Sequence, residues 1–160
     1  MNEAGGDGAK QEAAEEADEF LALVRLAEEF GFRIQTLQHG VEAYKIASEL
    51  KKSGVAAVVW SDWGAFKLEA YDATSYNARL LMEAGVVTSL HSDDAEISTR
   101  MNWEAGKLLR SGVNEIDALS TVTNQSAKAI AIDSRVGSLE AGKDADFVIW
   151  NGNPLSQFTK

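Results

Sequence analysis

Apolar residues recur every three or four positions in four stretches of the chain, and a glycine follows each stretch. This spacing predicts amphipathic helices, because it places the apolar side chains on one face, and glycine readily adopts the conformation that ends a helix. The predicted helices span residues 20–30, 43–50, 77–84 and 101–109, and the glycines are Gly31, Gly54, Gly85 and Gly112.

Runs of strand-forming residues follow the first three helices. They are FRIQTLQHG at residues 32–40, an apolar run at 55–60 and another at 86–90. Strands that alternate with helices favour right-handed crossovers and a parallel sheet, so the predicted fold class is α/β. Three strands alone would leave two unpaired sheet edges, which indicates a sheet with more strands than this sequence contains.

The pattern changes in the last third of the chain. Asn114 can cap a helix over residues 115–122, and a further helical turn is predicted at 127–131. Residues 136–155, VGSLEAGKDADFVIWNGNPL, predict a β-turn-β unit whose second strand spans 146–150. Both faces of that strand are apolar, so it requires covering layers that a short tail cannot supply.

The N-terminal segment differs in composition from the rest. Residues 1–19 read MNEAGGDGAKQEAAEEADE, in which Lys10 is the single basic residue. Glycine, alanine and glutamate cannot bury a core by themselves. We therefore expect residues 1–17 to form a flexible acidic segment, and the alternative is a solvated cap over an interface.

Charge and composition narrow the classes of partner. The formal net charge is −10, and nucleic acids and anionic membranes are bound chiefly through Lys and Arg clusters, so neither is expected. The chain has no cysteine, which leaves histidines and carboxylates as ligands for any metal. No apolar run is long enough to cross a bilayer and no signal peptide is visible, so a cytoplasmic location is expected.

Candidate chemistry gathers in GVVTSLHSDDAE, residues 85–96, where a short apolar strand ends in a polar cluster. Loops at the carboxyl ends of parallel strands converge, and function collects there. His91 lies two residues before Asp93, so both would point to one side of an extended strand, and His91 is a candidate additional ligand or supporting residue. The alternative is that the polar residues start the next helix, which is the expected role of Asp94 and Glu96.

Three segments carry a family resemblance. Residues 121–156, TVTNQSAKAIAIDSRVGSLEAGKDADFVIWNGNPLS, resemble the carboxyl-terminal signature of the amidohydrolase superfamily, especially the imidazolonepropionase-like metal-dependent hydrolases. LQHGVEAYKIASEL at 37–50 resembles the sixth barrel strand and its helix, and LHSDDAE at 90–96 resembles the eighth strand with its metal-binding aspartate. The resemblance covers residues 18–156, and GKDAD is its most specific part.

The resemblance implies a fold and a cofactor. Residues 18–132 would be the carboxyl-terminal portion of a TIM (β/α)8 barrel, with strands six to eight and their helices. Residues 133–160 would be an incomplete segment of a composite β-sandwich. The implied cofactor is a divalent metal, with zinc expected.

Site residues follow from the same resemblance. His39 matches the sixth-strand histidine, and Asp93 matches the eighth-strand aspartate, which binds metal and takes a proton from the attacking water. Both are therefore expected to be metal ligands and catalytic residues. Expected contacts to a small-molecule substrate are Trp63, Lys67, Glu69 and His91. For Lys67 and Glu69 the alternative is a solvated face.

The sequence also departs from the family pattern. It has no HxH pair for the first strand, no fourth-strand lysine, and no fifth-strand histidine near Ala13. The expectation is therefore a fragment of a hydrolase of carbon–nitrogen bonds in amide-like or cyclic substrates, inactive alone and with at most two of the family's metal ligands. It would be either a homo-oligomer or a chain that lacks an N-terminal part. The alternative function is a non-catalytic α/β module or a subunit that needs a partner chain.

Overall fold

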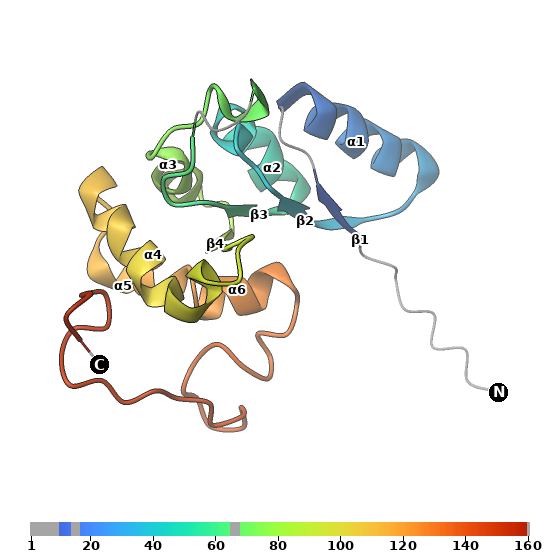
Figure 1. Ribbon diagram of the computed structural model, residues 1–160. Helices are drawn as coiled ribbons and strands as arrows, with labels where there is room; N and C mark the ends of the chain where they lie inside the picture. The colour runs from blue at the N-terminus through green and yellow to red at the C-terminus, as the bar shows by residue number, and fades with distance from the viewer. Residues whose placement is uncertain (1–9, 14–16, 65–67, 160) are drawn as a thin grey trace.

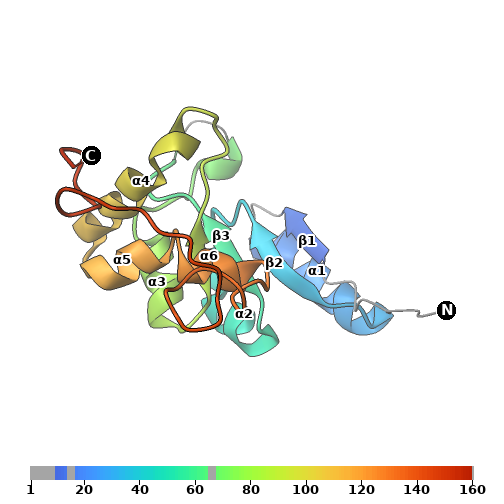
Figure 2. The same cartoon turned by 90° about the horizontal axis from the view of Figure 1, so that it is seen from below.

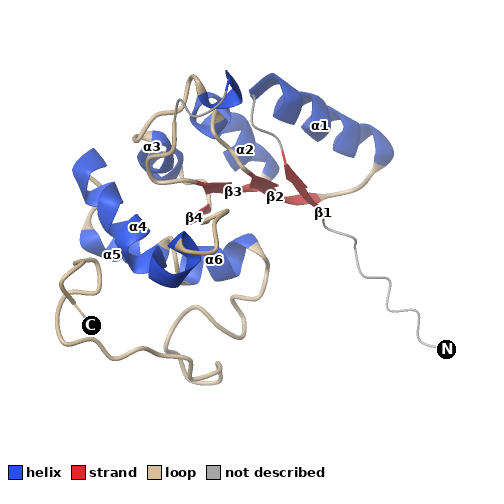
Figure 3. Cartoon of the chain, viewed as in Figure 1, coloured by secondary structure: helices blue, strands red, loops and turns tan. Residues whose placement is uncertain are grey.

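The computed structural model describes residues 10–13, 17–64 and 68–159. At its centre lies a parallel four-stranded sheet in the order β1-β2-β3-β4, with helices on both sides (Figure 1; Figure 3). The strands are β1 (Lys10–Ala13), β2 (Ile34–Gln38), β3 (Ala56–Val59) and β4 (Thr88–Leu90). The α/β class with a parallel sheet is thus confirmed, whereas the partial TIM (β/α)8 barrel stays a prediction.

Three helices and a 3₁₀ turn cover one side of the sheet (Figure 1). They bury the side chains of Leu37 and Val59 from the strands against Leu50 and Leu81 from the helices. Glycine ends the second helix because Gly54, at φ 70°, adopts the left-handed conformation that satisfies the last carbonyls. The elements are α1 (Ala17–Phe30), η1 (Ala43–Ile46), α2 (Ala47–Ser53) and α3 (Asn77–Glu83).

The opposite side of β3 and β4 packs on α6 (Asn124–Ala129), which lies below the sheet in Figure 1 and in front of it in Figure 2. Ala56 and Val58 alternate along β3 with Ala57 and Val59, which face the helices on the other side of the sheet. Ala56 and Val58 pack against Ala129, as expected for a strand buried on both faces. The buried Thr36 hydroxyl donates a hydrogen bond to the carbonyl of Ala129 and ties β2 to the same helix.

The remaining helical elements lie beyond β4 or in the loops. Asn114 caps α5 as predicted, because its side chain accepts a hydrogen bond from the Asp117 amide. The elements are α4 (Met101–Lys107), α5 (Glu115–Ser120), η2 (Leu68–Ala70), η3 (Ile97–Arg100) and η4 (Leu108–Ser111).

Within the described residues, no helix combines the length and the apolar character that a membrane span requires.

Strand β1 corrects part of the expectation for the N-terminal segment. Residues 10–13 lie inside the stretch predicted to be flexible, yet they pair in parallel with β2 from Lys10↔Ile34 to Ala13↔Gln38. The amino-acid composition of residues 1–17 indicates how much apolar surface this segment can bury by itself. It does not show that β1 can gain backbone hydrogen bonds from the neighbouring strand β2. Residues 1–9 and 14–16 of that stretch lie outside the described residues.

The predicted β-turn-β unit is wrong, since no strand forms among residues 131–159. Phe147 and Ile149 are 65% and 83% exposed. No strand of the described chain lies beside them, and without a partner the segment has no ladder of backbone hydrogen bonds. Assignment of residues 133–160 to a composite sandwich stays a prediction.

The tail is nevertheless attached to the core at its far end. Leu155 is buried in the main apolar cluster, and the Asn102 side chain donates a 2.7 Å hydrogen bond to the Pro154 carbonyl. Glycine is needed opposite this contact, because a Cβ atom on Gly106 would lie 2.4 Å from the Leu155 carbonyl oxygen.

Replacing Leu81 by alanine should lower the free energy of unfolding by about 3 kcal/mol, because it opens a cavity in the core that joins α3 to the sheet. The matched control is Leu80→Ala on the same helix, since Leu80 is 40% exposed whereas Leu81 is fully buried. The control should cost less than about 1 kcal/mol. Urea unfolding measures both, and equal losses would contradict this placement of the core.

Candidate metal centre

The loops that follow β2, β3 and β4 meet at one edge of the sheet. His39 comes directly after β2, Trp60 directly after β3 and His91 directly after β4. Backbone hydrogen bonds continue the pairing past the strand ends: Gly40 N–H donates to Val58 O at 3.1 Å, and His91 N–H donates to Val59 O at 3.2 Å. The carboxyl ends of parallel strands therefore bring both histidines of the sequence together.

His39, His91 and Asp93 form a cluster whose candidate ligand atoms all lie within 4.8 Å of one another. The two imidazole rings stack with centroids 5.0 Å apart and planes 5° from parallel, and His39 Nε2 lies 3.9 Å from Asp93 Oδ1. Ligands at 2.0–2.1 Å from a tetrahedral metal lie about 3.3 Å from each other, so the three side chains would have to move closer and the stacked rings to turn before they shared one ion. The cluster could hold a divalent metal.

The environment of His91 fits a metal ligand. Its Nε2 atom is buried and has no hydrogen-bond partner among the described residues. Burial and the neighbouring His39 lower the pKa of His91 to about 4, although Asp93 acts in the opposite direction. The imidazole is thus neutral at pH 7, which is the protonation state that binds metals. His91 is therefore a candidate third ligand in addition to its predicted contact with substrate.

His39 and Asp93 share an unusual backbone conformation. Their φ angles are 57° and 48°, and they are two of the three non-glycine residues with positive φ in the described ranges. Such conformations are disfavoured for residues with a Cβ atom and persist where the surroundings hold them. The backbone at both predicted ligands is therefore constrained by more than local preference.

Two tryptophans stand beside the cluster. The Trp60 ring centroid lies 4.4 Å from that of His91 and 5.2 Å from that of His39, and Trp60 is buried. Trp63 stacks on Trp60 at 5.3 Å with nearly parallel planes and stays partly exposed. Trp60 was not among the predicted site residues, although its place directly after a strand, like that of both histidines, is a signal that could have found it.

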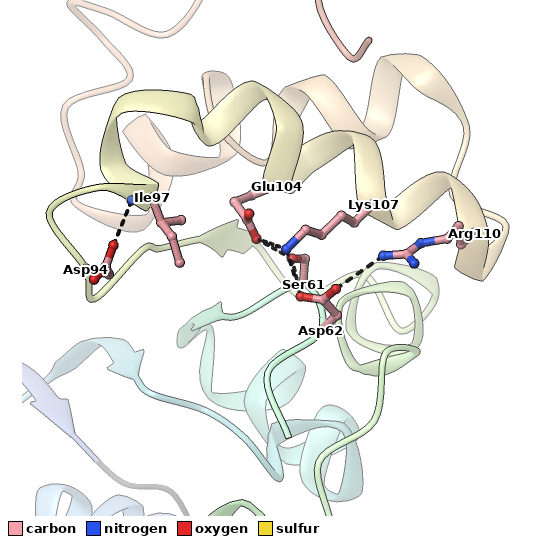
Figure 4. A network of polar contacts seen from close by, with 7 residues as sticks. All are labelled: Ser61, Asp62, Asp94, Ile97, Glu104, Lys107 and Arg110. Carbon is pink, nitrogen blue, oxygen red and sulfur yellow. Dashed lines mark hydrogen bonds and ion pairs between the residues drawn. The ribbon is translucent and has the colours of Figure 1, made fainter. Parts of the chain in front are cut away.

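Two other predicted substrate contacts stay predictions. Lys67 lies outside the described residues, and Glu69 belongs to η2 in the loop after β3. Asp94 takes the alternative role expected of it, since its Oδ1 accepts hydrogen bonds from the amides of Glu96 and Ile97 at the start of η3 (Figure 4). Its carboxylate therefore caps that turn.

A second polar network fixes the loop after β3 (Figure 4). The Ser61 hydroxyl donates to the buried Glu104 carboxylate at 2.7 Å, and Lys107 Nζ bridges Glu104 at 2.9 Å and Asp62 at 3.0 Å. Burial acts to lower the pKa of Lys107, but the hydrogen bonds and charges of the two carboxylates outweigh it and raise that pKa. The charged Lys107 thus ties this loop to α4.

Comparison with known proteins gives matches to amidohydrolases. The model of the amidohydrolase family matches residues 3–160. The amidohydrolase tasK of Hapsidospora irregularis is 29% identical over 139 residues, which make up 84% of this chain and 14% of that protein. This chain therefore spans only a small part of that curated relative.

Solved structures agree with the sequence matches. The crystal structure of an amidohydrolase from Thermotoga maritima MSB8 has a TM-score of 0.87 and 35% identity, over 94% of this chain and 40% of that one. An adenosine deaminase from Xanthomonas campestris with bound zinc has a TM-score of 0.62 and 20% identity, over 88% of this chain and 36% of that one. The second likeness shows the fold alone.

We expect the chain to bind a divalent transition metal, and we expect His39→Ala, His91→Ala and Asp93→Ala each to weaken binding at least about tenfold, because even residues that only support ligands have effects of this size. Competition with a chromophoric chelator measures the dissociation constants. Glu96→Ala is the control, since that exposed carboxylate pairs with Arg100 at 2.9 Å. Unchanged binding in His91→Ala would remove His91 from the ligand set.

Proposed function

The chain belongs to the amidohydrolase family, and from that membership we propose that it is a metal-dependent hydrolase of carbon–nitrogen bonds in amide-like or cyclic-amide small molecules. One observation carries the proposal. Ligand atoms of His39, His91 and Asp93, from two different strand ends, lie within 4.8 Å of one another. In this cluster the buried Nε2 atom of His91 has no hydrogen-bond partner in the described chain.

We propose zinc as the metal. Two imidazoles and a carboxylate match the donor set of catalytic zinc sites, which use three protein ligands and keep one position open. The zinc bound to the deaminase of similar fold is in keeping with this choice. Because residues 1–160 contain no cysteine, they can supply no thiolate ligand.

Each residue of the cluster has a role in this proposal. A divalent metal, when bound, supplies a Lewis acid that makes water nucleophilic near neutral pH. The Asp93 carboxylate is half exposed and has two oxygens, so one can bind metal while the other accepts a proton from the attacking water. His91, whose imidazole is neutral at pH 7, and His39 would hold the metal; alternatively His39 would polarise the scissile carbonyl.

Substrate contact is proposed for the partly exposed Trp63. Its indole extends the aromatic surface that begins with Trp60 against the two histidine rings. A flat side chain fixed by stacking can contact a substrate with little loss of conformational entropy. Lys67 and Glu69, in the same loop, stay predicted contacts.

The candidate centre lacks some groups that the family resemblance implies. The sequence has two histidines, His39 and His91, so it offers neither an HxH pair nor a histidine near Ala13. We therefore propose that turnover needs ligands from outside residues 1–160. The alternative of a non-catalytic module is not favoured, because all the matches described above are to amidohydrolases or a deaminase.

The activity test uses a panel of amides, dipeptides and cyclic amides with added zinc or manganese. Residues 1–160 alone should give no measurable turnover. A chimera in which this chain replaces the corresponding part of the Thermotoga maritima amidohydrolase should turn over at least one of these substrates, because the two chains superpose over 94% of this one. Asp93→Asn in the chimera should reduce turnover by about a hundredfold or more, since it removes the base.

Glu96→Gln is the matched control in the chimera and should leave turnover unchanged. Turnover by residues 1–160 that disappears in Asp93→Asn would show that the centre is complete without further ligands. A folded, metal-loaded chimera whose turnover is unaffected by Asp93→Asn would overturn the role of that carboxylate.

A further inference from the structure

Asn77 is a buried polar residue whose side chain forms hydrogen bonds with a loop distant from it in sequence. It is the first residue of α3 and only 4% exposed. Its Nδ2 atom donates to Gly40 O at 2.8 Å and to Val41 O at 3.0 Å, and its Oδ1 atom accepts from Tyr44 N–H at 3.1 Å. Both donor positions of the amide are therefore used on the two residues that follow His39.

The loop at these two residues turns sharply out of the sheet. Gly40 N–H still pairs with Val58 O, but the next amide, Val41 N–H, bonds back to His39 O at 2.7 Å. Space is tight, because a Cβ atom on Gly40 would lie 3.0 Å from Ala43 Cβ and 3.3 Å from a Leu37 methyl. The buried Gly40 carbonyl accepts a 3.2 Å hydrogen bond from Ala43 N–H in addition to the one from Asn77, and the buried Val41 carbonyl accepts from Asn77.

His39 enters this turn with its backbone at φ 57°, in the left-handed region that residues with a Cβ atom seldom adopt. On the strand side, β2 is fixed by its pairing with β3. On the loop side, the Asn77 amide supplies side-chain hydrogen bonds to Gly40, Val41 and Tyr44.

We propose that Asn77 is a positioning residue for the metal centre: by holding the carbonyls of Gly40 and Val41, it keeps His39 in the left-handed conformation that aims its ring at His91 and Asp93. This inference rests on the proposed metal centre. Asn77 acts through the loop and has no hydrogen bond to the three candidate ligands. Its removal should therefore change metal affinity and coordination geometry in chains that remain folded.

The test is cobalt binding by residues 1–160, followed through the dissociation constant and the visible ligand-field spectrum. Asn77→Asp keeps the size and the acceptor for Tyr44 N–H but places oxygen against two carbonyls. Asn77→Ala removes all three bonds. Both should bind cobalt at least about tenfold more weakly, with a changed spectrum, as for other residues that orient metal ligands. Asn77→Ser, whose hydroxyl can donate one bond, should fall between them and wild type.

The matched control is Asn102→Ala. It also removes a hydrogen bond from a side-chain amide to a backbone carbonyl, but that bond attaches the tail at Pro154. It should leave cobalt affinity and spectrum unchanged even where stability falls. Circular dichroism gives the folded fraction, and affinities are compared per folded chain. Asn77→Ser keeps the test decisive if the other two variants fail to fold.

The outcomes separate the two proposals. If wild-type protein does not bind cobalt at all, the proposed metal centre is wrong. If wild type binds and the folded Asn77 variants bind equally tightly with the same spectrum, the metal centre stands and the positioning role of Asn77 is wrong. A loss of stability alone, with unchanged affinity per folded chain, is this second result.

Discussion

Parallel pairing of β2, β3 and β4 is the constraint on which the candidate centre depends. Leu37 pairs with Ala57, and Val59 pairs with Leu90, so the strands end at nearly one level. A slip of one residue in either ladder would turn every side chain of a strand to the opposite face. His39 and His91, which are 52 positions apart in sequence, stack on each other because this register is fixed by buried side chains on both faces of the sheet.

Helices packed on the sheet fix the loops that follow the strands. Each of two strand-end loops is fixed by one buried polar side chain from a following helix: Asn77 of α3 bonds the loop after β2, and Glu104 of α4 bonds Ser61 after β3. In both cases the helix buries its apolar residues in the core and presents a polar group to the loop at the strand ends. Leaving such a buried group unpaired is unfavourable, so the helix position and the loop conformation stabilise each other.

Local signals in the sequence predicted the elements that local interactions determine. The glycine after each predicted helix marks its end, and Asn114 caps α5. Both could be predicted because the conformational preference of glycine and the capping hydrogen bond of asparagine act within a few residues. Strand β1 and the absence of a strand at Phe147 could not be predicted in this way, since each depends on whether another strand lies beside it. His91 was placed near Asp93 by spacing, but its contact with His39 follows only from the sheet register.

The features that define the centre are also the ones that weaken the fold around it. Positive φ angles at His39 and Asp93 are strained, and the buried Nε2 of His91 has lost its water without gaining a partner in the described chain. In the proposed centre, a bound metal ion would offset the second penalty directly, because it would coordinate the lone pair of a neutral imidazole. It would also favour the two positive-φ conformations, since these present His39 and Asp93 to it. Binding to the folded state alone also raises stability by mass action. In the proposed centre, metal affinity and local stability at this edge of the sheet would therefore be one coupled property, set by the two strand ends that carry His39, His91 and Asp93.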